Sequence, residues 1–440
     1  MQLKIEKLVY GGEGIARLVD EKSGRAKAVF VPFVGPDEVV EASIIEEKPG
    51  FARARADKIL QSSPARIEPP CPYFLRCGGC QYQHLEYAAQ EQAKAQILEE
   101  TLGRTAKLKL DRPIQTHAAE PYHYRNRTRM RVVHDPEFAV GYYRYGSHSL
   151  LPVEQCPISS PLINRALGVL WELGRNERID EAIREVQFFV NDDDSKLLLE
   201  FFIEHGVEPE TLRATIEVLR GTMAEIVGVA VFHGAPADDT EDQRAPLTRA
   251  KSSTGTFFGD RSLVYSTEHF DYQVSAGAFF QVNRFLLDDM ITTVTAGRSG
   301  KVALDLYAGG GFFSLPLAEK SQQLIAVEAS TYSYSDLKAN APHNVKAIRG
   351  ATEEFLRSEV RRYSPDLILV DPPRAGLGES TARLLGRTSA PRVTYVSCDP
   401  ATLARDMKVL LESGFHVEEA HLFDLFPQTF HLESVLHLAR

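Results

Sequence analysis

The sequence predicts an α/β protein with a doubly wound, Rossmann-like domain in its C-terminal part. A small OB-like β-barrel and a central α+β domain precede it. After residue 300, four apolar segments each end in small, polar or acidic residues, and helical stretches separate them. This pattern is typical of a parallel sheet with helices on both faces. The first 60 residues contain short strand-like segments with Gly-rich or Pro-containing turns, which favour a barrel.

Composition and charge limit the classes of function. The chain has 440 residues, 43% of them hydrophobic, which is long enough for two or three domains. No apolar run approaches the ~20 residues of a membrane-spanning helix, and the first residues lack the apolar core of a signal peptide. We therefore predict a cytoplasmic protein that does not bind membranes. A net charge of −10 excludes a polycation, so nucleic-acid binding requires local basic patches.

Turn and linker signals divide the chain into four predicted parts. Residues 1–62 form the barrel, and residues 63–92 contain three of the five cysteines. Residues 93–262 form the central α+β domain, which holds a fourth cysteine, and residues 263–440 form the Rossmann-like domain. The cysteine segment is expected to pack on the C-terminal domain despite its early position in the chain.

A cofactor pocket is predicted at the carboxyl ends of the C-terminal strands, where such sheets bind ligands. The segment 305–311, DLYAGGG, reads as a strand followed by a tight loop with Gly309 and Gly311, and the next strand ends in Glu328. A dinucleotide fingerprint requires a third glycine where Ser314 stands. With the segment DPPR, which begins at Asp371, the set favours S-adenosylmethionine. The alternatives are a dehydrogenase, or a glycine turn that merely precedes a helix.

Cys398 ends another predicted parallel strand, and Asp399-Pro400 then fits the start of a helix. A helix N-terminus favours a thiolate. Carbon 5 of uracil is a poor nucleophile, and addition of a thiolate at carbon 6 activates it toward a methyl donor. A general base must then remove the carbon 5 proton. If the last strand is antiparallel, Glu433 lies at the same sheet edge as Cys398. The alternatives are a buried structural cysteine and a solvated glutamate.

The other four cysteines suggest a metal site. Cys71, Cys77 and Cys80 are close in sequence, and Cys156 follows much later. Four thiolates can hold zinc or an iron–sulfur cluster. Structural zinc usually takes two close pairs, so a triplet with one distant cysteine favours [4Fe–4S]. The alternative is four free, buried thiols.

Two features suggest RNA binding. Four arginines alternate in YHYRNRTRMR, and a period of two places them on one face of a predicted strand, where they would meet phosphates. They are Arg125, Arg127, Arg129 and Arg131. Phe279 and Phe280 are candidates for stacking on a base that is turned out of the RNA. The alternatives are a solvated strand face and ordinary core packing.

Taken together, these segments resemble the RNA (uracil-5-)-methyltransferases of the 23S ribosomal RNA type that carry an iron–sulfur cluster. The resemblance covers nearly the whole chain. The N-terminal strands resemble a TRAM domain, and YHYRNRTRMR resembles the family's basic segment. The cysteine segments CPYFLRCGGCQYQH and QCPI resemble the cluster ligands. The catalytic motifs are FFQVN, LDLYAGGGFFSLPLA, DPPRAG, VSCDPATLARD and HLES.

The resemblance implies a class I methyltransferase that acts as a monomer on 23S ribosomal RNA. Cys398 would be the nucleophile and Glu433 the base. S-adenosylmethionine would contact Gln281, Tyr307, Glu328 and Asp371. A [4Fe–4S] cluster would bind Cys71, Cys77, Cys80 and Cys156. Phe312 and Ala351 depart from the family pattern at cofactor contacts. A methyltransferase for the tRNA T-loop and a non-catalytic RNA-binding assembly factor remain alternatives.

Overall fold

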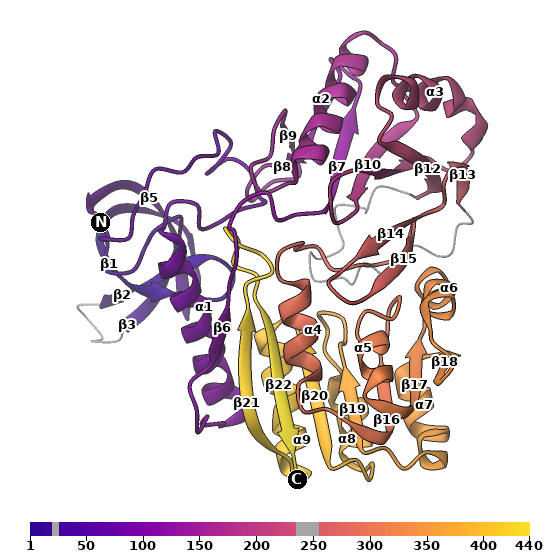
Figure 1. Cartoon of the computed structure of the whole chain (residues 1–440). Helices are drawn as coiled ribbons and strands as arrows, with labels where there is room; N and C mark the ends of the chain where they lie inside the picture. The colour runs from indigo at the N-terminus through magenta and orange to yellow at the C-terminus, as the bar shows by residue number, and fades with distance from the viewer. Residues whose placement is uncertain (20–25, 235–254) are drawn as a thin grey trace.

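The computed structural model describes residues 1–19, 26–234 and 255–440. Figure 1 shows three regions: a barrel on the left, a central sheet at the top and a large C-terminal sheet below them. Among the described helices, none is long and apolar enough to cross a membrane.

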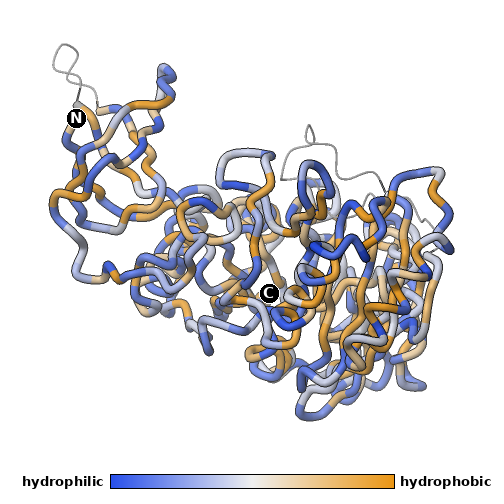
Figure 2. The backbone as a smooth tube through the Cα atoms, turned by 90° about the horizontal axis from the view of Figure 1, so that it is seen from above, coloured by the Kyte–Doolittle hydropathy of each residue, from blue (hydrophilic) through white to orange (hydrophobic). Residues whose placement is uncertain are grey.

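The N-terminal strands close into a barrel in the order β1-β2-β3-β5-β4, as predicted. Its strands are β1 (Gln2–Leu8), β2 (Glu13–Val19), β3 (Ala26–Pro32), β4 (Val39–Glu47) and β5 (Phe51–Gln61). Inward residues such as Ile5, Val29 and Ala54 are fully buried, whereas their sequence neighbours face solvent, because side chains alternate along a strand. Figure 2 shows this alternation along the barrel, which stands at one end of the molecule.

The central region is a seven-stranded sheet in the order β13-β12-β11-β10-β7-β8-β9. Its strands are β7 (Arg127–Val133), β8 (Ala139–Tyr143), β9 (Leu150–Pro152), β10 (Ile183–Val190), β11 (Leu197–Ile203), β12 (Ile226–His233) and β13 (Thr256–Gly259). Helices α2 (Pro161–Arg175) and α3 (Arg213–Thr222) pack on it, with a 3₁₀ turn at Pro209–Leu212. Ser160 caps α2 by accepting from the Ile163 amide, and Pro161 fits the first helical position.

The C-terminal region is an eight-stranded sheet in the order β18-β17-β16-β19-β20-β22-β21-β6. Its strands are β6 (Gln115–His117), β16 (Gly300–Leu306), β17 (Ser321–Glu328), β18 (Val345–Arg349), β19 (Leu367–Val370), β20 (Arg392–Ser397), β21 (His416–Phe423) and β22 (Glu433–Ala439). The strands from β16 to β20 are parallel, which confirms the doubly wound prediction. Its helices are α4 (Leu287–Thr295), α5 (Ser314–Glu319), α6 (Thr331–Asn340), α7 (Thr352–Ser358), α8 (Gly378–Gly386) and α9 (Pro400–Glu412), with a 3₁₀ turn at Val360–Arg362. A hairpin of β14 (Ser262–Ser266) and β15 (Asp271–Ser275) joins this sheet to the central region.

Residues 87–117, which the sequence assigned to the central domain and the end of the cysteine segment, pack on the C-terminal sheet instead. Helix α1 (Tyr87–Thr101) and the π-helical turn Leu102–Ala106 share one core with that sheet, and β6 adds a strand to its edge. The cysteine segment docks nearby as predicted, because the amides of Gln81 and Tyr82 both donate to the Gln428 carbonyl. A buried ion pair between Lys94 and Asp424, with Nζ and Oδ1 2.6 Å apart, fixes α1 there.

Candidate active site

Cys398 and Glu433 lie at the ends of two neighbouring strands. Strands β20 and β22 are antiparallel, as predicted, and Ser397 pairs with Ser434. One further step in this register sets Cys398 opposite Glu433. The Ser434 hydroxyl donates to the Ser397 carbonyl at 3.1 Å, which holds the two strand ends together. The thiol is half-buried and the carboxyl is buried, so both groups line the edge of the sheet.

The predicted helix start after Cys398 is also confirmed. Asp399 is the N-cap of α9, and its Oδ1 accepts hydrogen bonds from the amides of Ala401 and Thr402, both at 2.9 Å. Pro400 occupies the first turn, where its missing N–H costs nothing. The nucleophile candidate therefore precedes a rigid, capped helix.

Burial controls the protonation of the site. Burial, followed by the charges of Glu433 and Asp371, raises the pKa of the Cys398 thiol. Burial and Asp371 raise the pKa of Glu433 well above its ordinary value. Burial and then Asp305 raise the pKa of Asp371 to about 7. Low polarity thus favours the neutral form of each acid, and the site holds few negative charges until a cation approaches.

Arg374 is a site residue whose role the sequence did not reveal. Its positive charge opposes the rise in pKa of both Cys398 and Glu433. Its Nη2 lies 3.4 Å from the His431 Nδ1, and burial, followed by Arg374, lowers the pKa of His431 to about 3. The DPPR motif pointed to this arginine, but only the fold places its charge beside the thiol.

Tyr10 is a second residue that sequence reasoning missed. It lies in the turn between β1 and β2 of the barrel, and its hydroxyl donates to Asp399 Oδ2 at 3.2 Å. Its ring contacts Phe430 edge-on, with ring centroids 5.5 Å apart. The neighbouring Gly12 lies so close to Gln81 that an added Cβ would approach its Cγ to 2.7 Å. The barrel therefore reaches the residue next to Cys398, which no local sequence pattern indicates.

The glycine loop has the geometry of a ligand-binding turn. Tyr307, Gly309 and Gly311 have φ values of 66°, 55° and 95°, and this left-handed region is strained for a residue with a side chain. Glu328 ends β17, and its Oε2 accepts from the Gly309 amide at 2.9 Å. Strand end and loop are thus joined by one carboxylate.

Ser314 stands where a dinucleotide-binding loop has its third glycine, and it has a structural partner. Its hydroxyl donates to Asp305 Oδ2 at 2.5 Å. Burial, opposed by this bond, raises the pKa of Asp305 to about 7. The other carboxyl oxygen, Oδ1, is buried with no hydrogen-bond partner among the described residues. An unsatisfied buried oxygen beside a glycine loop is a position for a ligand donor.

Gln281 and the two phenylalanines before it differ in exposure. Gln281 is buried, and its carbonyl accepts from the Asn126 side chain at 3.0 Å. Phe280 is buried in the core, whereas Phe279 is 57% exposed. Core packing accounts for Phe280, whereas the exposed ring of Phe279 is accessible from solvent, and its stacking on a base stays a prediction.

The two residues that depart from the family pattern, Phe312 and Ala351, lie in different surroundings. The Phe312 ring packs against Tyr272, Phe280 and Phe313 inside the core, so its side chain fills space rather than reaching into the loop. Ala351 is the N-cap of α7 and makes no side-chain cap.

The structure gathers Cys71, Cys77, Cys80 and Cys156 in one cluster with Phe74 and Tyr124. Burial, followed by the charges of Cys156 and Cys71, raises the pKa of Cys77 to about 11. The positive charge of Arg125 opposes this rise at Cys77 and Cys80.

The four alternating arginines, 125 to 131, do not form a continuous basic surface. Strand β7 begins at Arg127, so Arg125 precedes it, and Arg125 Nε is buried without a hydrogen-bond partner among the described residues. Arg127 is buried against Glu200, with Nη2 and Oε1 2.9 Å apart. Arg129 and Arg131 share Glu185, and Arg129 lies over the Phe202 ring. Alternation predicted the common face, but neighbouring strands supply acids that the sequence could not locate.

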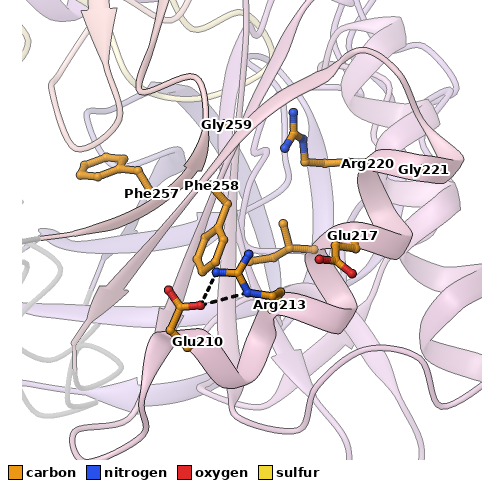
Figure 3. A pocket seen from close by; sticks show the side chains of 9 residues that line it. Glu210, Arg213, Glu217, Arg220, Gly221, Phe257, Phe258 and Gly259 are labelled. Carbon is orange, nitrogen blue, oxygen red and sulfur yellow. Dashed lines mark hydrogen bonds and ion pairs between the residues drawn. The ribbon is translucent and has the colours of Figure 1, made fainter.

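A surface hollow at α3 and β13 lies apart from these residues (Figure 3). The Arg213 side chain there donates to Glu210 and lies 5.3 Å from the Phe258 ring centroid. None of the residues predicted for catalysis, cofactor, cluster or RNA lines it.

Sequence comparison identifies two families in the chain. Residues 1–56 match the TRAM domain, which confirms the prediction for the barrel. Residues 86–440 match the family described as tRNA (Uracil-5-)-methyltransferase. The second match covers most of the chain and contains every predicted catalytic and cofactor residue.

Curated relatives match over nearly the full length. An uncharacterized RNA methyltransferase of Aquifex aeolicus is 32% identical over 99% of this chain and 97% of its own. The 23S rRNA (uracil(1939)-C(5))-methyltransferase RlmD of Halomonas elongata is 31% identical over 99% of this chain and 89% of its own. The RlmD protein of Pectobacterium atrosepticum is 30% identical over 96% of this chain and 90% of its own.

A solved structure supports the fold independently. The Pyrococcus abyssi tRNA (uracil-54, C5)-methyltransferase, in complex with S-adenosyl-L-homocysteine, superposes with a TM-score of 0.75 and covers 100% of both chains at 21% identity. Because a TRAM barrel, a parallel sheet with a glycine loop and two full-length sequence matches coincide, the chain belongs to the RNA uracil-5-methyltransferase family, whose members use S-adenosylmethionine.

Proposed function

We propose that this enzyme methylates carbon 5 of a uridine in 23S ribosomal RNA through a covalent adduct between Cys398 and carbon 6. The observation that carries this proposal is the register of β20 and β22, which sets Cys398 opposite Glu433 beside Arg374. A nucleophile and a base at one strand end are what methylation at carbon 5 needs. A protein that only binds RNA needs neither.

In the proposed reaction, the Cys398 thiolate adds to carbon 6 and moves the electron pair of the ring to carbon 5. S-adenosylmethionine supplies the electrophilic methyl group that carbon 5 attacks. Glu433 then takes the proton from carbon 5, and the electrons of that bond expel Cys398. A carboxyl with a raised pKa is a stronger base once it is ionised, so the burial of Glu433 favours this step. Arg374 stabilises the thiolate by its charge.

The residues around the glycine loop fit S-adenosylmethionine. Asp305 Oδ1 is buried and has no hydrogen-bond partner in the described part of the chain. The Glu328 carboxylate accepts hydrogen bonds from two amides but keeps lone pairs for ribose hydroxyls. Its end-of-strand position is the one that binds nucleosides in such sheets. The residues proposed to hold the cofactor are Gln281, Tyr307, Gly309, Gly311, Glu328 and Asp371.

The four-cysteine site fits a [4Fe–4S] cluster better than a single zinc ion. Structural zinc usually takes two close cysteine pairs, whereas these ligands are a close triplet and one distant cysteine, which the structure gathers in one group. Arg125 is half-buried beside them, its Nε has no hydrogen-bond partner among the described residues, and its charge offsets the negative charge of the thiolates. We propose a structural or RNA-docking role for the cluster, with no redox step.

Three observations support ribosomal RNA as the substrate. The RlmD relatives match over almost the whole chain, the TRAM barrel is present, and four cysteines are gathered. Phe279 is exposed and would stack on a flipped base. The shared pairing of Arg129 and Arg131 with Glu185 leaves these two arginines little free charge for phosphates. The alternative of a tRNA substrate stays open, because the family that matches residues 86–440 is described as tRNA (Uracil-5-)-methyltransferase. The dehydrogenase and the non-catalytic assembly factor have no support from the family matches.

The test uses purified protein with its iron content measured, S-adenosylmethionine with a labelled methyl group, and unmodified 23S ribosomal RNA beside unmodified tRNA. We expect labelled 5-methyluridine in the ribosomal RNA only, and a loss of at least ~10⁴-fold in Cys398→Ala because the activated nucleophile is gone. Label in tRNA alone would overturn the substrate. Full activity of Cys398→Ala would overturn the covalent mechanism.

A further inference from the structure

Helix α1 carries two polar residues on its buried face. On that face Ala93, Ile97 and Leu98 recur at the helical period and pack in the core of the C-terminal region. Gln90 and Lys94 stand on the same face one turn apart, and both side chains are fully buried. A buried polar group destabilises the fold unless it is hydrogen-bonded. The partners of these two side chains therefore show what this end of the helix does.

Both side chains bind the loop that connects β21 to β22, residues 424–432. Lys94 Nζ donates to the Phe426 carbonyl at 3.0 Å. Gln90 exchanges two hydrogen bonds with Gln428: its Oε1 accepts from the Gln428 amide, and its Nε2 donates to the Gln428 Oε1, both at 3.0 Å. Helix α1 thus holds the loop by one charged group and by one pair of amides.

The rest of the loop is also held from outside. The five consecutive carbonyls of residues 424 to 428 each accept a hydrogen bond from a group elsewhere in the chain. The donors are the Asn283 side chain for the first two carbonyls, then Lys94, the Tyr124 hydroxyl, and the amides of Gln81 and Tyr82. Such partners are needed because the loop is mostly buried, and an unpaired buried carbonyl costs free energy. Figure 1 shows the loop in yellow at the upper ends of β21 and β22, where the three regions meet.

Gln428 adopts a conformation that is strained for its residue type. Its φ is 70°, in the left-handed region that favours glycine, and its side chain is buried. Strained residues persist only where the surrounding structure over-determines them, and they cluster at functional sites. Gln90 binds the Gln428 amide, and the amides of Gln81 and Tyr82 bind its carbonyl. The backbone of the strained residue is therefore fixed on both sides.

The strained turn leads directly into the candidate active site. The Phe430 amide donates to Gln81 Oε1 at 3.3 Å, and the next residue, His431, lies beside Arg374. Glu433 then begins β22. A general base must stand within hydrogen-bond reach of the proton that it takes, and a displacement of about 1 Å can slow a reaction on the order of a hundredfold. The conformation of the loop therefore sets where the Glu433 carboxyl stands.

Docking of helix α1 is the alternative role of Gln90. Its Nε2 also donates to the Leu85 carbonyl at 2.9 Å, just before the helix, and Ile97 and Leu98 anchor the helix in the core. Apolar packing is enough for docking, and docking needs no residue with a positive φ. The two roles predict different defects. Loss of docking lowers stability alone, whereas loss of positioning slows one step of the reaction.

We propose that Gln90 is a positioning residue for the removal of the carbon 5 proton, because it holds Gln428 in the conformation that places Glu433. Lys94 supports the same loop from the next turn of α1. This role rests on the proposed function, in which Glu433 is the base, and it adds to that step a residue from outside the parallel sheet. It does not depend on which RNA is the substrate or on the cysteine cluster.

The test uses the full chain with its cysteine site loaded as purified, and whichever of 23S ribosomal RNA and tRNA it methylates. Gln90→Met removes the hydrogen bonds and nearly keeps the size. We expect turnover to fall about tenfold to a hundredfold. The covalent RNA adduct should accumulate, because its formation stays fast while proton removal becomes slow. The affinity for S-adenosylmethionine should stay at the wild-type value. Gln96→Met, the same change on the exposed face of α1, is the control.

Substitutions at Gln428 separate strain from a general loss of stability. Glycine adopts a φ of 70° without steric cost, so Gln428→Gly added to Gln90→Met should recover part of the turnover and reduce the adduct. If Gln90→Met fails to fold, Gln428→Ala and Gln428→Gly are compared in the wild-type background. Alanine keeps the strain, so it should turn over more slowly and accumulate more adduct than glycine. Equal behaviour of these two variants would overturn the proposal.

Glu433→Gln is measured beside these variants, so that the base and its positioning residue are judged separately. If Glu433→Gln accumulates no adduct, Glu433 is not the base, and the role of Gln90 falls with it. A different result concerns Gln90 alone: Glu433→Gln accumulates the adduct, while Gln90→Met forms no more than the wild type and loses activity only in proportion to its folded fraction. Gln90 would then dock helix α1 and position nothing.

Discussion

Strands β20 and β22 carry two polar pairs that differ only in their distance from the strand end. Thr394 lies opposite His437 inside the sheet, and four residues further along, Cys398 follows opposite Glu433 at its edge. Val396 and Val435, both fully buried, separate the pairs. Alternation puts all six side chains on one face. The same two strands thus present an inner pair, Thr394 and His437, inside the sheet and an outer pair, Cys398 and Glu433, at its edge.

Burial acts on both pairs in the same direction. It lowers the pKa of His437 to about 3 and raises that of Glu433, so each becomes neutral. His437 is held by Thr394 and Thr293, whereas Cys398 and Glu433 have the charge of Arg374 beside them. Low polarity by itself therefore makes no active site. What distinguishes the outer pair is the strand end, where a substrate and a cation can reach the groups.

After the loss of Cys398 itself, the largest expected effect comes from Glu433→Gln, which removes the proposed base and keeps the shape. Turnover should fall by about 10²–10⁴-fold, because general-base catalysis contributes this much. The covalent RNA adduct should still form and accumulate, visible as a band of reduced mobility on a denaturing gel. Glu412→Gln, the same change at the exposed end of α9, is the control. Normal turnover by Glu433→Gln would remove Glu433 from the mechanism.

Arg374→Met tests the positive charge that lies beside Cys398 and Glu433 and not beside Thr394 and His437. Since Arg374 opposes the rise in the pKa of Cys398, its loss raises that pKa further and leaves less thiolate at a given pH. The rising limb of the pH–rate profile should move to higher pH, with a loss on the order of tenfold near neutrality that high salt reduces. Arg383→Met, on the exposed face of α8, should leave the profile unchanged. If the rising limb of the pH–rate profile does not shift, Arg374 contacts RNA and does not control the pKa of Cys398.

Tyr10→Phe removes only the hydroxyl that joins the barrel to Asp399. A hydrogen bond typically contributes about 1 kcal/mol, so we expect roughly a fivefold slower formation of the adduct. The rate with RNA that contains 5-fluorouridine measures this step apart from RNA affinity. Tyr145→Phe, whose ring contacts Phe33 after the barrel strand β3, is the matched control. If only the affinity for RNA changes, the hydrogen bond between Tyr10 and Asp399 serves RNA docking and does not position Cys398.

The smallest effect is expected for Thr394→Val at the inner pair. The change leaves His437 Nδ1 without a donor and should lower the free energy of unfolding by about 1–3 kcal/mol. Turnover at moderate temperature should stay at the wild-type level. A large loss of turnover would mean that the two pairs are coupled.

Much of this protein could be predicted from local patterns. Apolar segments with polar ends specified the parallel sheet, and Asp399-Pro400 specified the start of α9. The antiparallel last strand brought Glu433 to Cys398 as expected. These features depend on neighbouring residues in the chain, and backbone hydrogen bonding and side-chain alternation act at that range.

The remainder depends on contacts between residues far apart in the sequence, which only the tertiary structure decides. Alternation indicated a common face for four arginines, but Glu200 and Glu185 on other strands neutralise three of them. Tyr10 meets Asp399 across 389 positions. Residues 87–117 join the C-terminal sheet because α1 buries Ile97 and Leu98 there. Burial and the pairing of charges arise only when the chain packs. Local sequence patterns therefore do not show which distant residue each side chain contacts.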